Sequence, residues 1–390
     1  MFDFDEEINR KNTASAKWMF PNVILPKYVT TAPLPLWVAD MDFRSPPCVI
    51  DALKSAIDHG IFGYGNVTDS MLEAIVNWQL NEFQWKIKPE WIVQTPGVVT
   101  AINFIIQAFT KPGDSIAIQT PVYAPFHSSP KNNGRYITDA PLKLENGRYI
   151  FDADIFESRL QKNTRMLILC NPHNPFGKVW SREELTAIGD ICLRHNILVI
   201  ADEIHQDLIF NADIKHIPFA SISEDFAKIT ITCTAPSKTF NVAGLQTSNL
   251  IISNPWLRLE LQNSLSRSGV PAPNILGQVA CEAAYRNGKP WLDELKKYLK
   301  DNFLLIKKSF SDNSNISVID TEALYLAWID FRGTGLQGDE LHQHLLINAG
   351  VWLDAGLKFG NNGSGFARIN FGCTRATLKE ALDRIERSFN

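Results

Sequence analysis

Thr234-Ala235-Pro236-Ser237-Lys238-Thr239-Phe240-Asn241 is the stretch on which the prediction of the fold depends. It follows the apolar, β-branched run 229–233, which predicts a buried strand. The chain then turns at Pro236 and presents Lys238 just past the strand end. Most lysines are solvated surface residues, but a lysine held at a strand end can be desolvated and become a nucleophile, for example in a Schiff base. The stretch by itself leaves both interpretations open.

Length and composition are those of a globular protein. The chain has 390 residues, 45% of them hydrophobic and 21% charged, which suits one or two domains. Its net charge of −4 gives no support for a nucleic-acid partner. The N-terminus lacks a signal-peptide pattern, the longest apolar runs are too short to span a bilayer, and the six cysteines include no Cys-x-x-Cys pair. We therefore expect a cytoplasmic protein with reduced thiols and no membrane partner.

Predicted strands and helices alternate through the first half of the chain. Each predicted strand is followed by a predicted helix: 91–94 by 98–109, 115–119 by 152–160, and 166–170 by 181–195. A further strand is predicted over 197–201. This order predicts an α/β fold with a mainly parallel sheet flanked by helices. From residue 281 onward the pattern changes to α+β. We predict a large domain over 48–285 and a smaller α+β domain formed by 1–47 and 286–390.

Polar side chains follow several of these strands directly. Asp202 and Tyr123 each come just after an apolar run, and Asn174 is framed by two prolines after a third run. Open α/β sheets bind ligands at the carboxyl ends of their strands, so these side chains are candidate site residues. Gly97 lies between a strand and a helix, where free backbone N–H groups can hold one phosphate. The glycine pattern of a dinucleotide site or a P-loop is absent.

Pyridoxal phosphate explains this set of residues. Lys238 would form the Schiff base with its aldehyde, Asp202 would keep the pyridine nitrogen protonated, and Asn174 would donate to the phenolate oxygen. Tyr123 would stack on the ring, and it is counted with Lys238 as catalytic. Phosphate binding is assigned to Gly97, Val98, Val99, Ser237 and Tyr64.

Four positions have a second interpretation. Asp40 and Asp42 either form local hydrogen bonds or face the site, and in the second case Asp40 contacts substrate. His205 is assigned to the cofactor site as a residue that donates to Asp202, with a catalytic acid as the alternative. Tyr64 lies between two glycines, either in an ordinary turn or in one that carries its phenol to a ligand or a partner subunit. No metal site is assigned.

The sequence resembles the aspartate-aminotransferase superfamily of fold-type-I pyridoxal-phosphate enzymes over almost its whole length. The resemblance rests on Asn171-Pro172-His173-Asn174-Pro175, Asp202-Glu203, Ser237-Lys238 and Arg368. Within the superfamily, the chain is similar to the cystathionine β-lyase (MalY/PatB-type) branch of C–S lyases. The residues that carry this similarity lie in 37–43, 59–65, 202–205 and 237–241.

The resemblance implies a homodimer with active sites at the subunit interface, where Tyr64 reaches the neighbouring subunit's phosphate. It also implies that Arg368 binds the α-carboxylate of an amino-acid substrate. The expected reaction is α,β-elimination, in which Lys238 removes the Cα proton and a thiolate leaves Cβ. Cystathionine or a related cysteine S-conjugate would yield pyruvate, ammonia and a thiol such as homocysteine. An aminotransferase is the first alternative, and a pyridoxal-dependent regulator that binds a partner protein is the second.

Two positions depart from the family's pattern. Ala235 replaces a serine or threonine that relatives often carry three residues before the lysine, and Gln246 replaces the phosphate-binding arginine of many aminotransferases. Phosphate binding is then expected to depend more on backbone N–H groups, Ser237 and Tyr64. Thr234 is a candidate for replacing the missing hydroxyl.

Overall fold

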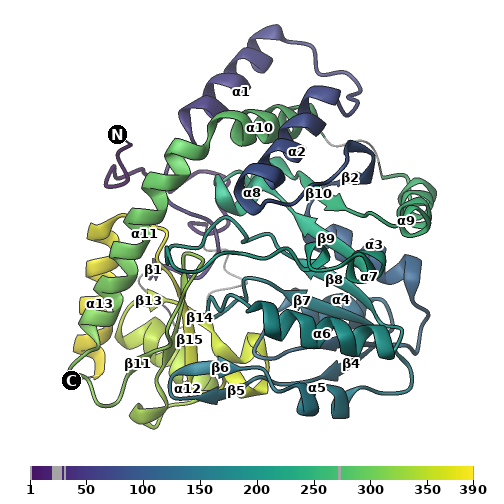
Figure 1. Cartoon of the computed structure of the whole chain (residues 1–390). Helices are drawn as coiled ribbons and strands as arrows, with labels where there is room; N and C mark the ends of the chain where they lie inside the picture. The colour runs from purple at the N-terminus through teal and green to yellow at the C-terminus, as the bar shows by residue number, and fades with distance from the viewer. Residues whose placement is uncertain (1, 20–28, 30–31, 271–273, 390) are drawn as a thin grey trace.

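A computed structural model describes residues 2–19, 29, 32–270 and 274–389; the remaining residues of the two predicted domains lie outside this description (Figure 1). The larger part of the molecule is built on a seven-stranded sheet, and a smaller four-stranded sheet lies beside it with the C-terminal helices. Among the described residues, we find no helix with the length and apolar character needed to cross a membrane.

The seven-stranded sheet has the strand order β2-β10-β9-β8-β7-β3-β4. Its strands are Ile92–Thr95 (β2), Ser248–Ile251 (β10), Thr230–Thr234 (β9), Leu198–Asp202 (β8), Thr164–Cys170 (β7), Ser115–Ile118 (β3) and Tyr136–Asp139 (β4). Neighbouring strands are parallel except for β10, which runs antiparallel to both β2 and β9. The predicted α/β fold with a mainly parallel sheet is confirmed.

Alternate residues of β7 enter two separate cores, because successive side chains of a strand point to opposite faces. Met166 and Ile168 pack with helices of one face, and Leu167 and Leu169 pack with helices of the other. The first face is covered by α3 (Val98–Phe109), α4 (Pro125–Asn132) and α9 (Pro255–Arg267), and the second by α5 (Ala153–Arg159), α6 (Arg182–Arg194) and α7 (Glu224–Lys228). Burial on both faces is the reason why these strands are continuously apolar in sequence.

Three further helices pack together at the top of the view in Figure 1: α1 (Pro47–His59), α2 (Asp69–Phe83) and α10 (Ile275–Asn287). Helix α1 ends at Gly60, whose φ of 74° is the left-handed conformation that glycine adopts without steric cost. Val49 is the one buried side chain of α1, and Ile57 near its end is 53% exposed. The tip of α1 therefore leaves apolar surface uncovered.

The C-terminal part contains the antiparallel sheet β11-β12-β15-β14. Its elements are β11 (Ser317–Val318), β12 (Leu326–Asp330), β14 (Asp354–Ala355), β15 (Phe366–Asn370), α11 (Lys289–Ser309), α12 (Gly338–Gln343, continued by a π-helix over His344–Asn348) and α13 (Arg375–Phe389). In the N-terminal segment, β1 (Leu34–Pro35) pairs with β13 (Val351–Trp352) of this part, and β5 (Lys143–Glu145) and β6 (Arg148–Ile150) form a separate hairpin. The domain boundaries stay a prediction.

Candidate active site

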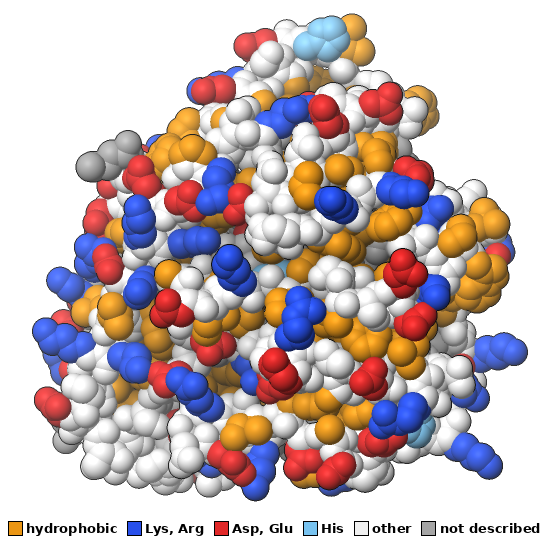
Figure 2. Space-filling model, in the orientation of Figure 1, with side chains coloured by type: hydrophobic (Ala, Val, Ile, Leu, Met, Phe, Trp, Pro, Cys, Tyr) orange, Lys and Arg blue, Asp and Glu red, His pale blue; other side chains and the backbone are white. Residues whose placement is uncertain are grey.

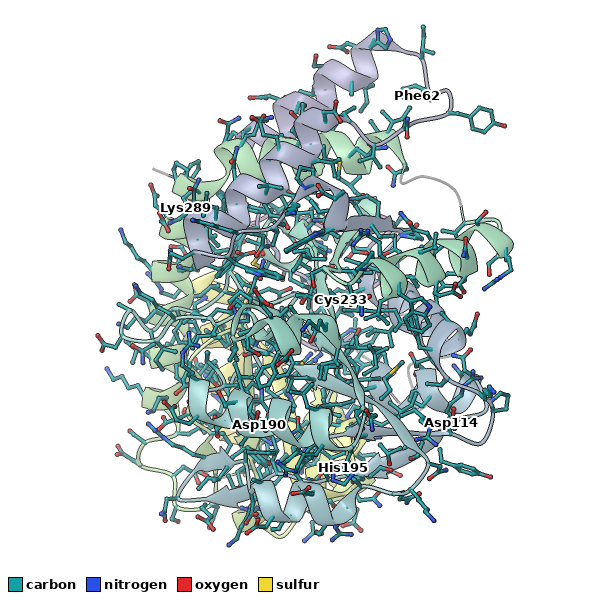
Figure 3. The ribbon with its side chains drawn as sticks, turned by 45° about the vertical axis from the view of Figure 1, so that its right-hand side comes forward. Phe62, Asp114, Asp190, His195, Cys233 and Lys289 are labelled. Atoms are coloured by element: carbon teal, nitrogen blue, oxygen red, sulfur yellow. The ribbon has the colours of Figure 1, made fainter. Side chains whose placement is uncertain are left out.

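Nine of the predicted site residues line one cavity of about 230 Å³. It lies just beyond the carboxyl ends of β7, β8 and β9, the place where open α/β sheets bind ligands. Cys233, labelled near the centre of the molecule in Figure 3, lies on β9, the strand that leads into the stretch with Lys238. The nine residues are Gly97, Val98, Val99, Tyr123, Asn174, Asp202, His205, Ser237 and Lys238.

Lys238 belongs to the short helix α8 (Pro236–Thr239), which begins two residues after β9. Its Nζ donates to the carbonyl oxygen of Ala39 at 2.7 Å, and the hydroxyl of Tyr325 donates to the same oxygen at 2.9 Å. Burial lowers the pKa of Lys238 to about 8, and the charge of Arg368 acts in the same direction. A large fraction of the amine is therefore neutral at mildly alkaline pH, as a nucleophile or base requires.

Asp202 is the last residue of β8 and is almost completely buried. Its Oδ1 accepts a hydrogen bond from the backbone N–H of Ile204 at 3.2 Å. Burial raises the pKa of Asp202 to about 7, and the neighbouring Glu203 adds to the shift. No cationic side chain of the described residues forms an ion pair with it, so this carboxylate is suited to hold a cationic N–H group of a ligand.

His205 lines the cavity but does not play the predicted part. Among the described residues it forms no hydrogen bond with Asp202, and its buried Nδ1 has no partner. Burial and the charges of Lys238 and Arg368 lower the pKa of His205 well below its usual value. The prediction that His205 donates to Asp202 is wrong, because no hydrogen bond joins these two side chains in the part of the chain that the structure describes.

Asn174 and Arg368 are joined side chain to side chain. Nη1 of Arg368 donates to Oδ1 of Asn174 at 3.1 Å, which leaves the amide N–H groups of Asn174 to serve the cavity. Nη2 of Arg368 donates to Asp354 and to the carbonyl of Trp37, both at 2.8 Å. Asp354 on β14 stands directly opposite Arg368 on β15. Arg368 is 3% exposed and does not line the cavity itself, but it is bonded to Asn174, which does.

Tyr123 follows β3 and contributes its ring to the cavity wall. Burial raises the pKa of its phenol, with the carboxylates of Asp202 and Asp354 adding to the effect. The hydroxyl is therefore protonated at neutral pH and can donate a hydrogen bond.

The N-terminus of α3 closes another side of the cavity. Gly97 has φ 122°, a conformation that favours glycine, and it brings the first turn of α3 to the cavity wall. The N–H of Gly97 itself donates to the Ser248 hydroxyl at 3.2 Å. Anion binding therefore falls to the next N–H groups, those of Val98 and Val99, for which no partner is found in the described chain.

The hydroxyl proposed to replace the missing serine or threonine is in the wrong place. Thr234 is fully buried on β9 and donates to the carbonyl of Asn249 at 3.2 Å. The hydroxyls that do line the cavity near α3 and α8 are those of Thr100, Thr247 and the predicted Ser237. Gln246 also lines it, with φ 48°.

Asp40 and Tyr64, like Arg368, do not line the cavity of the single chain. Both carboxylate oxygens of Asp40 accept from Arg10, at 3.1 and 2.7 Å, which favours the local alternative over a contact with substrate. Tyr64 is fully exposed in the loop after α1, two residues from Phe62, which Figure 3 labels in this loop near the upper end of the view. A role for Tyr64 therefore needs a second subunit.

The profile of the family "Aminotransferase class I and II" matches residues 33–385. The chain belongs to the class I and II aminotransferase family. It is 44% identical to cystathionine beta-lyase PatB of Bacillus subtilis, over 98% of this chain and 99% of that protein. Cystalysin from Treponema denticola, solved with pyridoxal 5'-phosphate, superposes with a TM-score of 0.95 at 38% identity, covering 100% of this chain and 98% of that one. A pyridoxal-phosphate-bound C–S lyase from Staphylococcus hominis superposes with a TM-score of 0.93 at 32% identity, with the same coverage.

The cofactor of this aminotransferase-family protein is pyridoxal phosphate, as predicted. The residues present fit each part of it. The buried carboxylate of Asp202 suits the pyridinium nitrogen, the amide N–H of Asn174 suits the phenolate, and the amine of Lys238 suits the aldehyde. The N–H groups of Val98 and Val99 suit the phosphate.

Several residues of the cavity were not predicted from the sequence. They are Ala39, Pro96, Thr100, Cys170, Ile204, Ala243 and Thr247. Most are small or apolar residues, or residues whose backbone forms the wall, and nothing in their local sequence distinguishes them from core positions. Cys170 had a usable signal, because it ends β7 directly before the Asn171-Pro172 motif.

Proposed function

We propose that this protein is a pyridoxal-phosphate-dependent C–S β-lyase. It cleaves cystathionine or a related cysteine S-conjugate, with water, to pyruvate, ammonia and a thiol such as homocysteine. The observation that carries the proposal is the grouping of Lys238, Asp202 and Asn174 around one cavity, with Arg368 bonded to Asn174. The 44% identity to a cystathionine beta-lyase over the whole chain supports the choice of reaction.

Each of these side chains has its own role in the proposed reaction. Arg368 binds the substrate α-carboxylate by a charge-assisted contact and thereby orients the Cα–H bond toward Lys238. Asp202, buried and without an ion-pair partner among the described residues, would hold the positive charge of the cofactor's ring nitrogen. Pyridoxal phosphate, when bound, supplies an aldehyde for amines and an electron sink for negative charge at Cα.

Lys238 then acts as the general base. Because its pKa is lowered to about 8, a large fraction of the amine is neutral at mildly alkaline pH and can take the Cα proton. Loss of that proton allows the thiolate to leave Cβ. Tyr123, with its phenol kept protonated by burial, is placed to donate a hydrogen bond within the same cavity.

We also propose that the active form is a homodimer in which Tyr64 completes the phosphate site of the partner. The support is the apolar surface at the tip of α1, which Figure 2 shows as hydrophobic side chains at the top of the molecule. Ile57, Ile61, Phe62 and Tyr64 are all more than half exposed there. Exposed apolar groups gathered at one place are typical of a binding surface. A cytoplasmic location stays a prediction.

Incubation of the purified holoenzyme with cystathionine, without any keto acid, tests the proposed reaction. Equimolar pyruvate and free thiol are expected. A strict requirement for a keto acid would instead identify an aminotransferase. The variant Lys238→Ala should form no pyruvate, and near-normal pyruvate release from it would refute the mechanism.

A further inference from the structure

The helix that carries Lys238 is only four residues long, from Pro236 to Thr239. A helix of one turn has little stability of its own, because nucleation costs more than the few hydrogen bonds return. The position of Lys238 must therefore be fixed by contacts that neighbouring segments make with α8. The structure contains one such contact at the residue directly after the lysine.

Thr239 donates from Oγ1 to Oδ2 of Asp207 at 2.6 Å. The other carboxylate oxygen, Oδ1, accepts from Nε1 of Trp78 at 2.9 Å. Thr239 is fully buried and Asp207 is 6% exposed. Trp78 is itself held by stacking on Tyr285, with ring centroids 5.2 Å apart. The carboxylate is thus fixed on one side by α2 and on the other by α8.

Asp207 also belongs to the turn that contributes other residues to the cavity lining. It follows Asp202 by five residues and His205 by two, and both of these line the cavity. Two backbone hydrogen bonds keep this turn compact: Gln206 N–H to Glu203 O at 2.9 Å, and Leu208 N–H to His205 O at 3.0 Å. Asp207 and Thr239 do not line the cavity themselves. Their bond is a direct link between the segment of Asp202 and the segment of Lys238.

We propose that Asp207 is a positioning residue for the reaction, which acts through Thr239 to hold Lys238 at a fixed place relative to Asp202. Asp202 would hold the pyridinium nitrogen of the cofactor and Lys238 would meet its aldehyde, so the bond would set the separation of the two residues that hold the cofactor. A displacement of the base by about 1 Å is enough to lower a rate by about two orders of magnitude. The kinetic consequence rests on the proposed function, whereas the effect on the bound cofactor does not.

Four variants of the full-length holoenzyme test the proposal. Thr239→Val removes the hydroxyl at nearly constant volume, Thr239→Ser keeps it, and Asp207→Asn removes the charge. Thr230→Val is the matched control, because Thr230 is equally buried and donates to the Phe226 carbonyl at 2.6 Å, at the other end of β9. Each variant is assayed for kcat and KM, and for the visible circular dichroism of the bound cofactor, which reports the tilt of its ring.

The proposal expects kcat of Thr239→Val and Asp207→Asn to fall about tenfold or more, with KM within about twofold of wild type. Their visible dichroism should change, Thr239→Ser should stay close to wild type, and Thr230→Val should lose only thermal stability. If Thr239→Val matches Thr230→Val in both kcat and dichroism, the proposal is overturned. If Asp207→Asn fails to fold, the comparison of Thr239→Val with Thr239→Ser decides whether the bond positions Lys238. If the wild-type protein shows no lyase activity, the proposed reaction fails, and the dichroism still decides the role of Asp207.

Discussion

Arg368 on β15 donates from Nη1 to Oδ1 of Asn174 at 3.1 Å, and so joins two residues that lie 194 positions apart in the sequence. The bond fixes the orientation of the Asn174 amide, since its oxygen faces the guanidinium and its N–H groups face away from it. One contact therefore couples the residue proposed to bind the substrate carboxylate with the residue proposed to bind the cofactor phenolate.

Replacing Asn174 by alanine should weaken both sites at once. Arg368 would lose one of its buried acceptors, and the cofactor would lose a hydrogen-bond donor. We expect KM to rise and the dissociation constant of pyridoxal phosphate to increase, each by about tenfold. Steady-state kinetics and equilibrium dialysis measure these effects. Asn163→Ala, which removes an exposed amide bonded to the Gly113 carbonyl, is the control and should leave both constants unchanged. An increase in only one constant would show that the two sites are not coupled.

Asp202→Asn should stabilise the cofactor-free protein at neutral and alkaline pH. The pKa of Asp202 is raised from 3.8 to about 7, so between these values the folded chain keeps a proton that the unfolded chain has released. The free energy of unfolding therefore falls as pH rises through this window, and the loss is complete above about pH 7. Asparagine removes the titration and should raise the free energy of unfolding by roughly 1–4 kcal/mol at about pH 8, and by much less near pH 4.

Thermal unfolding of the cofactor-free wild type and variant at several pH values measures this difference. The same variant should bind pyridoxal phosphate at least about tenfold more weakly, because the charge that holds the pyridinium is gone. A cofactor-free wild type that is more stable than the variant at about pH 8 would contradict the expected burial cost. Asp225→Asn, at an exposed carboxylate on α7, is the control and should show neither effect.

The residues at strand ends could be predicted from the sequence, because one local rule covers them all. Asp202, Asn174, Tyr123 and Lys238 each follow an apolar run, and a parallel sheet brings the carboxyl ends of such runs to the same edge. The topology therefore gathers these residues without any knowledge of their contacts. The helix predicted over 181–195 is equally local: in the structure Ser181 caps α6 and forms a capping box with Glu184.

Apart from His205, the positions that the sequence left open or placed differently involve hydrogen bonds between distant segments. The N–H of Gly97 is taken by Ser248 because β2 and β10 are paired, a contact across 151 residues. Thr234 donates to a carbonyl of the same neighbouring strand. Asp40 pairs with Arg10, and no local pattern distinguishes that partner from a substrate. Such pairings depend on which strands and segments become neighbours in the fold. Local patterns in a single sequence do not reveal these neighbours.

Gln246→Arg should tighten cofactor binding. Gln246 lines the cavity near α8, at the position where many relatives carry an arginine that binds the phosphate. A guanidinium can form two charge-assisted hydrogen bonds to a phosphate, whereas the amide offers only neutral N–H donors. We expect the dissociation constant of pyridoxal phosphate to fall by about fivefold, measured by equilibrium dialysis. Gln246→Met, similar in length and without donors, should not tighten binding. Equal or weaker binding by the arginine variant would show that this side chain does not reach the phosphate.

Mixing two inactive variants tests whether Tyr64 acts across a subunit interface. Tyr64 is fully exposed in the single chain and does not line the cavity that holds Lys238. If each active site combines Lys238 of one subunit with Tyr64 of its partner, Tyr64→Ala and Lys238→Ala homodimers each contain two defective sites. A heterodimer of the two contains one intact site and one site with both defects. Random exchange of subunits makes half of the dimers heterodimers, so the mixture should recover about a quarter of the wild-type activity.

The recovery should depend on subunit exchange and therefore appear only after the mixed dimers have been dissociated and allowed to reassociate. Mixing Lys238→Ala with Asp202→Ala is the control, because both residues line the same chain's cavity. In that heterodimer each site carries one defect, and no activity should return. If the mixture of Tyr64→Ala and Lys238→Ala stays at the activity of its separate components, Tyr64 serves its own subunit or none. The exposed apolar tip of α1 would then need a different partner.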